Sequence, residues 1–165
     1  MRVLGIDPGT VRMGFGVLDE RDGKTSLTQC GVLKAPADLP IEARLQQLYD
    51  ALLEIVDEWR PDQVAIEEPF VNRNVRSAMM VGEAKAVAIL AATGRGVPVS
   101  RYAPRQVKQA VTSYGGSDKE QVQEMVRLQL GLDTPPEPLD ASDAIAVALC
   151  HLQQASLGRI LAGDA

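Results

Sequence analysis

Val3-Leu4-Gly5-Ile6-Asp7-Pro8-Gly9-Thr10 is the stretch from which the fold can be read. Its short apolar run is typical of a buried strand, and the run ends at a carboxylate followed by a Pro-Gly turn. Because Pro8 disfavours helical backbone at the residue before it, we assign Asp7 to the end of this strand. Ligands bind beyond the carboxyl ends of strands in open α/β sheets, which makes Asp7 a candidate for chemistry. On this stretch alone, the alternative that Asp7 only caps the turn is equally good.

A second β-branched run, at residues 63–67, also ends in acids and is followed by a proline. As in the first run, a small residue stands two positions before the acid, here Ala65 before Glu67. Side chains alternate between the two faces of a strand, so the small residue shares a face with the acid and leaves room beside it. This pattern favours Glu67 over Glu68 as the inward-facing carboxylate, and we interpret Glu68 as a solvated neighbour.

A third group of acids, Asp140 and Asp143, follows a proline-rich loop at 134–138 and begins a predicted helix. Residues three apart lie on one helix face, with Cβ atoms ~5–6 Å from each other. The helix dipole favours acids in a first turn, and this explains either residue alone. It does not explain why both lie on the face that continues as Ala144 and Val147, which we expect to pack on the sheet.

We therefore hypothesise that Asp7, Glu67, Asp140 and Asp143 converge on one site. Two carboxylates ~5 Å apart at an effective dielectric of ~20 repel by roughly 3 kcal/mol, so four together require protonation or a cation. Oxygen ligands from several elements suit Mg²⁺, with Mn²⁺ as a substitute. Two such ions ~3.5–4 Å apart can activate water and stabilise the leaving oxygen of a phosphodiester. This predicts two ions per active site and metal-dependent phosphodiester hydrolysis.

The composition is that of an ordinary globular domain, with 165 residues of which 45% are hydrophobic and 24% charged. We predict one domain spanning 1–165, with a frayed tail from about residue 156. Asp7 interrupts the amino terminus before a signal peptide could form, and no uncharged apolar run approaches the ~18 residues of a membrane span. Cys30 and Cys150 stand alone in apolar segments and are interpreted as buried free thiols. We expect a cytoplasmic protein without a membrane partner.

The net charge of −5 argues against a nucleic-acid partner, but the distribution of charge along the chain argues for one. Residues 1–70 carry 7 Lys/Arg and 13 Asp/Glu, residues 71–130 carry 9 and 4, and residues 131–165 carry 1 and 5. The acidic excess lies in the segments with the candidate metal ligands, and the middle of the chain is basic. This asymmetry indicates a surface for an anionic partner.

The remaining pattern predicts an α/β fold with a mixed five-stranded sheet. Short turns predict antiparallel hairpins from the first three strands, at 3–6, 13–18 and 27–33. Two more strands follow at 63–67 and 97–102, the former parallel to the first. Helices are predicted at 41–59, at 77–92, at 104–111, from a capping box at 117–120 to Gly131, and at 140–154.

Two of these helices differ in the pattern of their apolar residues. The 41–59 helix has one apolar stripe that includes Leu48 and Leu52, and Arg44 lies off this stripe. The 77–92 helix is apolar nearly all round and should be buried on more than one side. A partner subunit would cover the second side in a homodimer, and another helix of the same chain is the alternative.

The chain resembles the RuvC family of bacterial Holliday-junction endonucleases in five motifs, which occur in this order: Gly5-Ile6-Asp7-Pro8-Gly9, Ala65-Ile66-Glu67, Phe70, Arg105-Gln106-Val107-Lys108-Gln109 and Asp140-Ala141-Ser142-Asp143-Ala144. The resemblance runs nearly end to end. It implies an RNase H-like fold and a homodimer that needs Mg²⁺ or Mn²⁺. It also implies paired, symmetric nicks in four-way junction DNA during recombination and repair, together with the RuvA–RuvB branch-migration complex. By motif, the family's four catalytic acids fall on the set reached above from spacing.

The same resemblance implies contacts with DNA. Phe70 matches an aromatic that the family uses against DNA bases, although Pro69 stiffens its link to the preceding strand and a hydrophobic plug over the strand end is the alternative. Lys108 and Lys119 match lysines on the DNA-facing side, where they would hold phosphates, and Lys108 is also implied in catalysis. Arg105, in the basic motif, is a further candidate DNA contact. Other candidate phosphate contacts, with an ordinary polar loop as their alternative, are Asn72, Arg73 and Arg76, in the segment after Phe70.

Other functions explain the motifs less well. An RNase H-like nuclease of the YqgF type, linked to ribosomal RNA, would share the first motif but leaves the basic 105–109 segment unexplained. An actin-like module using residues 7–10 as a phosphate loop needs a second domain, and 165 residues leave no room for it. An inactive DNA-binding scaffold would not keep the acid set. His151, two helical turns beyond Asp143, is a poor general base, so water activation is expected from the metal.

Overall fold

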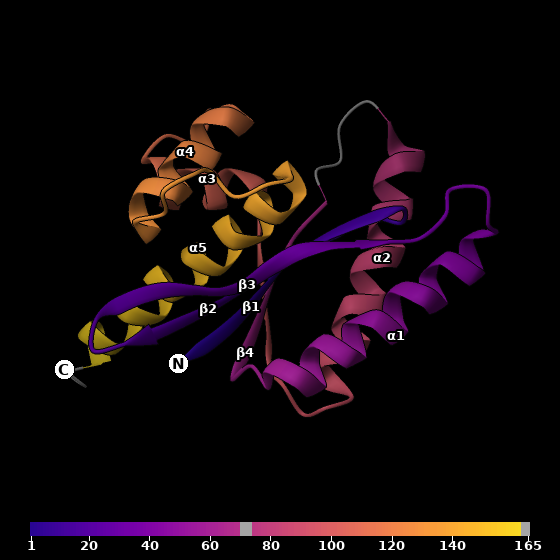
Figure 1. Cartoon of the computed structure of the whole chain (residues 1–165), viewed down its shortest axis with the longest axis horizontal. Coiled ribbons are helices and arrows are strands. Elements are labelled where there is room, and N and C mark those ends of the chain that lie inside the picture. Colours follow the sequence, from indigo (N-terminus) through magenta and orange to yellow (C-terminus); the bar gives the residue numbers. More distant parts are fainter. Residues whose placement is uncertain (70–73, 163–165) are drawn as a thin grey trace.

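The computed structural model describes residues 1–69 and 74–162 and has one mixed sheet between two layers of helices (Figure 1). The elements in chain order are β1 (Arg2–Asp7), β2 (Arg12–Arg21), β3 (Lys24–Lys34), α1 (Ile41–Trp59), β4 (Gln63–Glu67), α2 (Val75–Thr93), β5 (Val99–Tyr102), α3 (Pro104–Thr112), α4 (Lys119–Leu130) and α5 (Leu139–Ala162).

The sheet has the strand order β3-β2-β1-β4-β5. β1, β2 and β3 form the predicted antiparallel hairpins, and β4 is parallel to β1, so both predictions are confirmed. β5 is in turn parallel to β4. Because Ile6 pairs with Ile66 across β1 and β4, Asp7 and Glu67 end neighbouring strands at the same edge of the sheet.

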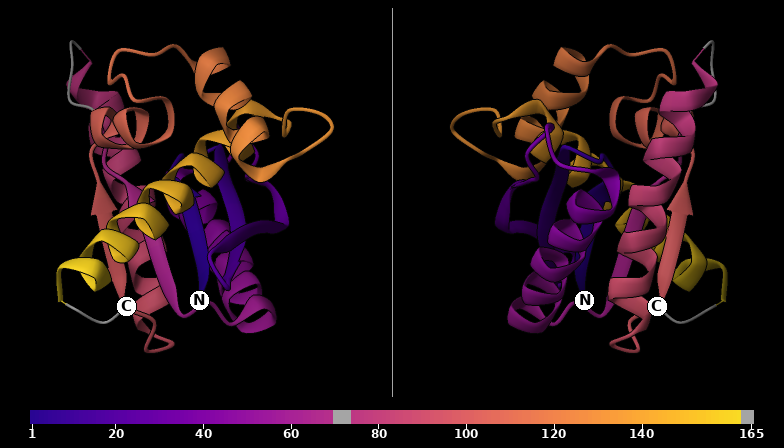
Figure 2. Two further views of the ribbon diagram at one scale, coloured as in Figure 1. Left: turned by 90° about the vertical axis from the view of Figure 1, so that its left-hand side faces the viewer. Right: turned by 90° about the vertical axis from the view of Figure 1, so that its right-hand side faces the viewer.

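The two faces of the sheet are covered by different helices, as Figures 1 and 2 show: α1 and α2 lie on one face, and α5 with α3 and α4 on the other. Alternation along β1 assigns its side chains to these two cores, with Leu4 and Ile6 packing towards α1 and α2 and Val3 towards α5. Asp7 therefore points to the α5 side, where Asp140 and Asp143 begin the helix.

Helix α5 lies unusually close to the sheet because three glycines face it. A Cβ added at Gly5 would overlap the carbonyl oxygen of Ala144, and one at Gly14 would overlap the carbonyl oxygen of Asp140. A Cβ at Gly16 would overlap the side chain of Ile145. The room that we predicted beside Asp7 is thus filled by the backbone of the helix that carries the other two acids. The buried residues Ala144, Val147 and Ala148 confirm that this helix face packs on the sheet.

Arg44 departs from the sequence prediction. We placed it off the apolar stripe of α1, yet it is only 9% exposed, and its NH1 donates to Thr10 Oγ1 at 3.3 Å. Its Nε has no hydrogen-bond partner among the described residues. The apolar stripe of the helix did not indicate that Arg44 is buried. Its partner Thr10 lies in the turn after β1, which is distant from α1 in the sequence.

Several element boundaries also differ from the prediction. The α4 cap lies one residue later than the predicted Ser117, since Asp118 accepts from the Gln121 N–H and the Gln121 side chain accepts from Asp118 N–H. β5 begins at Val99 rather than Val97, because the Val97 N–H closes the turn after α2 by donating to the carbonyl of Ala92.

The last helix is longer than predicted. α5 continues to Ala162, past the expected end at Gln154 and through the segment from residue 156 that we expected to be frayed. An ion pair of Arg159 with Glu20, with N and O atoms 3.1 Å apart, ties the last turns to β2. Among the described residues, α5 alone is long and apolar enough to cross a membrane by length and composition, but half of that window is buried, as in a core helix.

Candidate active site

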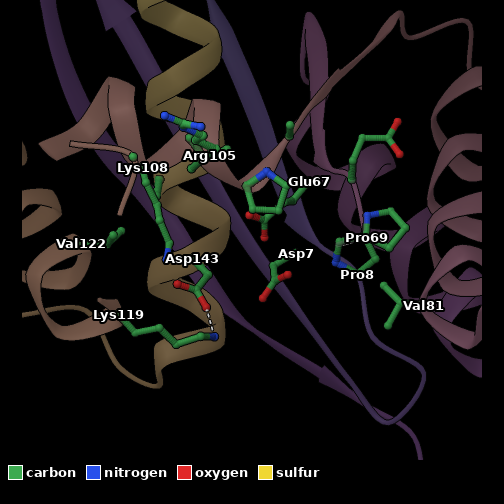
Figure 3. A pocket seen from close by; sticks show the side chains of 16 residues that line it. Asp7, Pro8, Glu67, Pro69, Val81, Arg105, Lys108, Lys119, Val122 and Asp143 are labelled. Atoms are coloured by element: carbon green, nitrogen blue, oxygen red, sulfur yellow. Dashed lines mark hydrogen bonds and ion pairs between the residues drawn. The ribbon is translucent and has the colours of Figure 1, made fainter. Parts of the chain in front are cut away.

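A cavity of about 740 Å³ opens at the edge of the sheet where β1 and β4 end (Figure 3). Asp7 reaches it from β1, Glu67 from β4 and Asp143 from the first turns of α5, and their carboxylates point into the same space. Three of the four predicted acids, from distant parts of the sequence, therefore meet. The other charged side chains that line the cavity are Glu68, Arg105, Lys108 and Lys119.

Asp7 and Glu67 lie close enough in the cavity to influence each other's ionisation. Burial, followed by repulsion from Asp143, raises the pKa of Asp7 above its usual range. Burial, followed by repulsion from Asp7, raises the pKa of Glu67. Negative charge is therefore crowded in the cavity, and the ionised pair favours a cation.

Lys119 supplies one positive charge to this cluster from the first turn of α4. Its Nζ lies 2.5 Å from Asp143 Oδ2, and the two side chains are 58% and 15% exposed. Burial lowers the pKa of Lys119, but the hydrogen bond and charge of Asp143 outweigh it, so the pKa is raised overall. Lys119 therefore stays charged at neutral pH, and its charge balances that of Asp143.

Asp140 lies at the edge of the site rather than among the residues that line it. The guanidinium of Arg12, from the start of β2, binds Asp140 Oδ2 through Nε at 2.9 Å and NH2 at 2.8 Å. Asp140 is still near enough for its charge to contribute to the raised pKa of Asp7. The prediction missed Arg12, since nothing local in the sequence links β2 to a residue 128 positions later.

The carboxylate oxygens of the site are suitable ligands for a hard divalent cation, although they are not arranged in a coordination geometry. Asp7, Glu67 and Asp143 offer only oxygen atoms, and the raised pKa values record an excess of negative charge. Within residues 1–69 and 74–162, no group of three His, Cys, Asp or Glu side chains is arranged to hold a metal ion as it stands. The ion pairs with Lys119 and Arg12 account for this, because they draw Asp143 and Asp140 towards side-chain cations.

The other predicted site residues fall in three places. Lys108 and Arg105, both on α3, line the cavity together with the acids. Arg76 is exposed in the first turn of α2 and is not among the lining residues of the cavity. Phe70, Asn72 and Arg73 lie outside the described residues.

Glu68 is not the solvated side chain that we predicted. Its Oε2 lies 2.6 Å from Lys85 Nζ of α2, and its Oε1 lies 3.5 Å from Arg101 Nε of β5. Lys85 and Arg101 belong to α2 and β5, which lie beside β4 only in the folded chain. The sequence around Glu68 therefore gave no sign of these ion pairs. They hold Glu68 on the far wall of the cavity, opposite α5.

The only histidine has a structural role, as expected. His151 is buried in α5, and its Nδ1 lies 2.8 Å from the Tyr102 hydroxyl while its Nε2 contacts Gln63 Oε1. Burial lowers its pKa. Cys30 and Cys150 are free thiols, the first half-buried and the second buried. None of these three side chains lines the cavity.

Known proteins share both the sequence and the fold. A family model described as crossover junction endodeoxyribonuclease RuvC matches residues 3–151. A protein of that description from Chloroflexus aurantiacus is 52% identical over 151 residues, which is 92% of each chain. The structure of Thermus thermophilus RuvC in complex with a Holliday junction substrate has a TM-score of 0.89 at 40% identity and covers 96% of each chain.

A more distant protein is similar to this chain in fold only. The yeast mitochondrial Holliday junction resolvase Ydc2 has a TM-score of 0.69 at 15% identity, over 96% of this chain and 82% of that one. The predicted RNase H-like α/β fold is confirmed by these structures. The chain belongs to the RuvC family of crossover junction endodeoxyribonucleases.

Proposed function

We propose that this chain is a structure-specific endonuclease that resolves four-way DNA junctions by paired, symmetric nicks in recombination and repair. Its family supports this activity, and so does its likeness to Thermus thermophilus RuvC, which binds a Holliday junction substrate. The observation that carries the proposal is the meeting of Asp7, Glu67 and Asp143 in one cavity that is also lined by Arg105, Lys108 and Lys119. A phosphodiester would lie between the carboxylates and the basic side chains.

We propose Mg²⁺ as the metal, replaceable by Mn²⁺, with two ions per site. Asp7, Glu67 and Asp143 would hold it, and Asp140 would join them on leaving Arg12. When bound, the metal supplies an activated water and stabilises the leaving oxygen. Burial and, after it, repulsion between the acids raise the pKa of both Asp7 and Glu67, which supports a requirement for a cation when they are ionised.

The basic residues would bind the DNA backbone. Lys108 and Lys119 would hold the reacting phosphate and neutralise charge that develops on it, and Arg105 would bind a neighbouring phosphate. The segment between β4 and α2 would add a stacking contact from Phe70 and phosphate contacts from Asn72 and Arg73, and the first turn of α2 would add a phosphate contact from Arg76. Binding that rests on phosphates should weaken steeply with salt.

We propose that the active unit is a homodimer in which α2 faces a second copy. The side chains of Val75, Met79 and Leu90 on this helix are 59%, 68% and 60% exposed, and three exposed apolar side chains on one helix offer surface for a partner. A two-fold axis suits a substrate with two equivalent strands, because it places one site on each. A cytoplasmic location is proposed from the sequence features given above, and action with the RuvA–RuvB complex from the family resemblance.

The first experiment separates binding from chemistry. Asp7→Asn removes one carboxylate from the cavity and leaves the basic side chains in place. We expect junction cleavage in Mg²⁺ to fall below detection while the junction dissociation constant in a chelator stays within about threefold of wild type. Loss of binding together with cleavage would contradict this separation of roles.

A second experiment defines the substrate. The wild-type protein, with and without Mg²⁺, is offered a synthetic four-way junction, a linear duplex of the same arms and an RNA–DNA hybrid. We expect nicks only in the junction, at symmetric positions, and only with the metal. Preferential cleavage of the hybrid or of a structured RNA would instead support the YqgF-type alternative.

A further inference from the structure

The connection between α3 and α4 lies at the end of the molecule where α5 begins (Figure 2). Tyr114 is part of this connection. α3 carries Arg105 and Lys108, α4 begins with Lys119, and the residue after Tyr114, Gly115, lines the cavity with them. The tyrosine is 67% exposed. A large ring is thus presented to solvent beside the basic side of the candidate active site.

Two consecutive glycines, Gly115 and Gly116, leave space into which neighbouring side chains pack. A Cβ added at Gly116 would lie 2.7 Å from Cζ and from the hydroxyl oxygen of the Tyr114 ring. A Cβ added at Gly115 would lie 2.7 Å from Cγ of Arg105. The ring and the Arg105 side chain therefore rest on adjacent residues, and a side chain at either glycine would displace one of them.

The backbone that carries the ring is held by its neighbours. Tyr114 N–H donates to Thr112 Oγ1 at 3.2 Å, and Ser117 Oγ donates to the Tyr114 carbonyl at 2.9 Å. Gly115 N–H donates to the side chain of Gln109 at 3.1 Å. This network holds the backbone from which the ring projects, and the ring itself lies against Gly116, so part of the entropy cost of ordering it is met in the free protein.

The folded chain gains little from the ring itself, because two-thirds of Tyr114 stays in water and the loop hydrogen bonds use its backbone. A pre-oriented aromatic next to side chains that bind phosphate is the combination with which proteins hold unpaired or splayed nucleotides. We propose that Tyr114 is a DNA-binding residue that stacks on a nucleobase of the strand entering the cavity, while Arg105 binds the adjoining phosphate. This inference rests on the proposed junction-binding function.

The test compares variants of this loop with a control on the same pair of helices. Tyr114→Ala removes the ring, and Tyr114→Phe keeps the ring without the hydroxyl. Gly116→Ala adds a methyl group that would displace the ring. Leu128→Ala is the matched control, because Leu128 is also exposed, at 54%, but lies about 14 Å along α4 from Lys119. Junction affinity is measured by fluorescence anisotropy in a chelator at several salt concentrations, with thermal unfolding as a check on folding.

We expect Tyr114→Ala to weaken junction binding by at least about fivefold, the lower end of the effect of losing one stacked base. Gly116→Ala should weaken it in the same direction, and Tyr114→Phe and Leu128→Ala should bind like wild type. The slope of affinity against salt should not change, because no phosphate contact is lost. A 2-aminopurine at the stacked position should be quenched by wild type and Tyr114→Phe but not by Tyr114→Ala.

Three results would overturn the inference. Tyr114→Ala could bind like wild type, Tyr114→Phe could weaken binding as much as Tyr114→Ala, which would show a hydroxyl contact, or the salt slope could fall, which would show a lost phosphate contact. Each of these leaves the proposed function intact when wild type binds the junction. Failure of the wild-type protein to bind a junction would overturn the proposed function instead.

Discussion

Asp7 and Glu67 share a cavity with Asp143, and both have a raised pKa. Burial is the largest cause for each, repulsion from Asp143 adds to both, and repulsion from Asp7 adds to the shift of Glu67. The protein therefore maintains a cluster of acids that is unfavourable without a cation. Such a cluster is a place where function and stability oppose each other.

Asp7→Asn should stabilise the metal-free protein at mildly alkaline pH by about 1–3 kcal/mol, the scale of repulsion between two carboxylates ~5 Å apart at a dielectric of ~20. A carboxyl whose pKa is raised on folding contributes stability that is fully present below its unfolded pKa and is lost as pH rises through the folded pKa. For Asp7 this loss begins above the ordinary value of 3.8. The advantage of the variant should therefore grow as pH rises.

Urea unfolding in a chelator, from about pH 5 to about pH 8, measures this advantage. Asp38→Asn is the control, because Asp38 is an exposed aspartate in the connection between β3 and α1, away from the cavity. A variant at Asp7 that is less stable than wild type at the upper end of this range would show that the carboxylate is not repelled there.

At the scale of elements, the contact of α5 with β1 and β2 sets the positions of the acids. The contact is close only because Gly5, Gly14 and Gly16 lack side chains where the helix crosses the strands. It brings Asp143 over the end of β1, and it brings the carbonyl of Asp140 against Gly14. The geometry of the cavity therefore depends on glycines that carry no chemistry themselves.

Gly5→Ala should destabilise the protein by about 1–3 kcal/mol, because the added methyl meets helix backbone, which cannot turn aside as a side chain can. It should also lower cleavage more than junction binding, because a shift of α5 moves Asp143 relative to Asp7. Urea unfolding and single-turnover cleavage measure the two effects.

Gly158→Ala provides the comparison, on α5 itself rather than on the strand that α5 packs against. An added Cβ there meets nothing within 4 Å. Replacing a helical glycine with alanine in open space should leave stability unchanged or raise it by up to about 1 kcal/mol. If Gly5→Ala proved as well tolerated as Gly158→Ala, the close approach would not constrain α5.

At the scale of the whole molecule, the two helical layers have different surroundings. The buried part of α5, up to Leu152, is covered by α3 and α4 on one side and by the sheet on the other, whereas its last turns expose Leu157, Ile160 and Leu161. α2 packs on α1 and the sheet through its alanines, and its opposite side exposes Val75, Met79 and Leu90. The apolar character of α2, noted in the sequence, is thus only partly explained by the fold of one chain.

Met79→Glu should convert the proposed dimer into a monomer, because it replaces the most exposed of the three apolar side chains with a charge. Sedimentation equilibrium measures the change of mass, and circular dichroism checks that the fold is retained. Paired nicking of a junction should become sequential, since one protein no longer presents two sites.

Leu128→Glu is the control for this variant, because it adds the same charge to an exposed leucine on α4. It should leave the mass unchanged. A wild-type protein that sediments as a monomer at micromolar concentration would contradict the proposed interface.

The spacing of apolar residues and the positions of turn residues in the sequence were sufficient to predict most of the fold and part of the site. The three hairpin strands, the parallel strand at residues 63–67 and the helix at 41–59 were found because apolar spacing and turn residues are local signals. The acids at strand and helix ends could be singled out for the same reason. Helix ends, such as Ala162 in place of Gln154, were not, since they depend on contacts with other elements.

By itself, the sequence determined which residues could form the site: carboxylates at the tips of two buried strands and in the first turn of a helix. Only the tertiary structure decided how their charges are balanced, with Lys119 on Asp143, Arg12 on Asp140 and Lys85 on Glu68. These pairs join side chains from different elements, so no pattern along the chain records them. Secondary structure follows from neighbours in sequence, whereas the partner of a charge follows from which elements the folded sheet brings side by side.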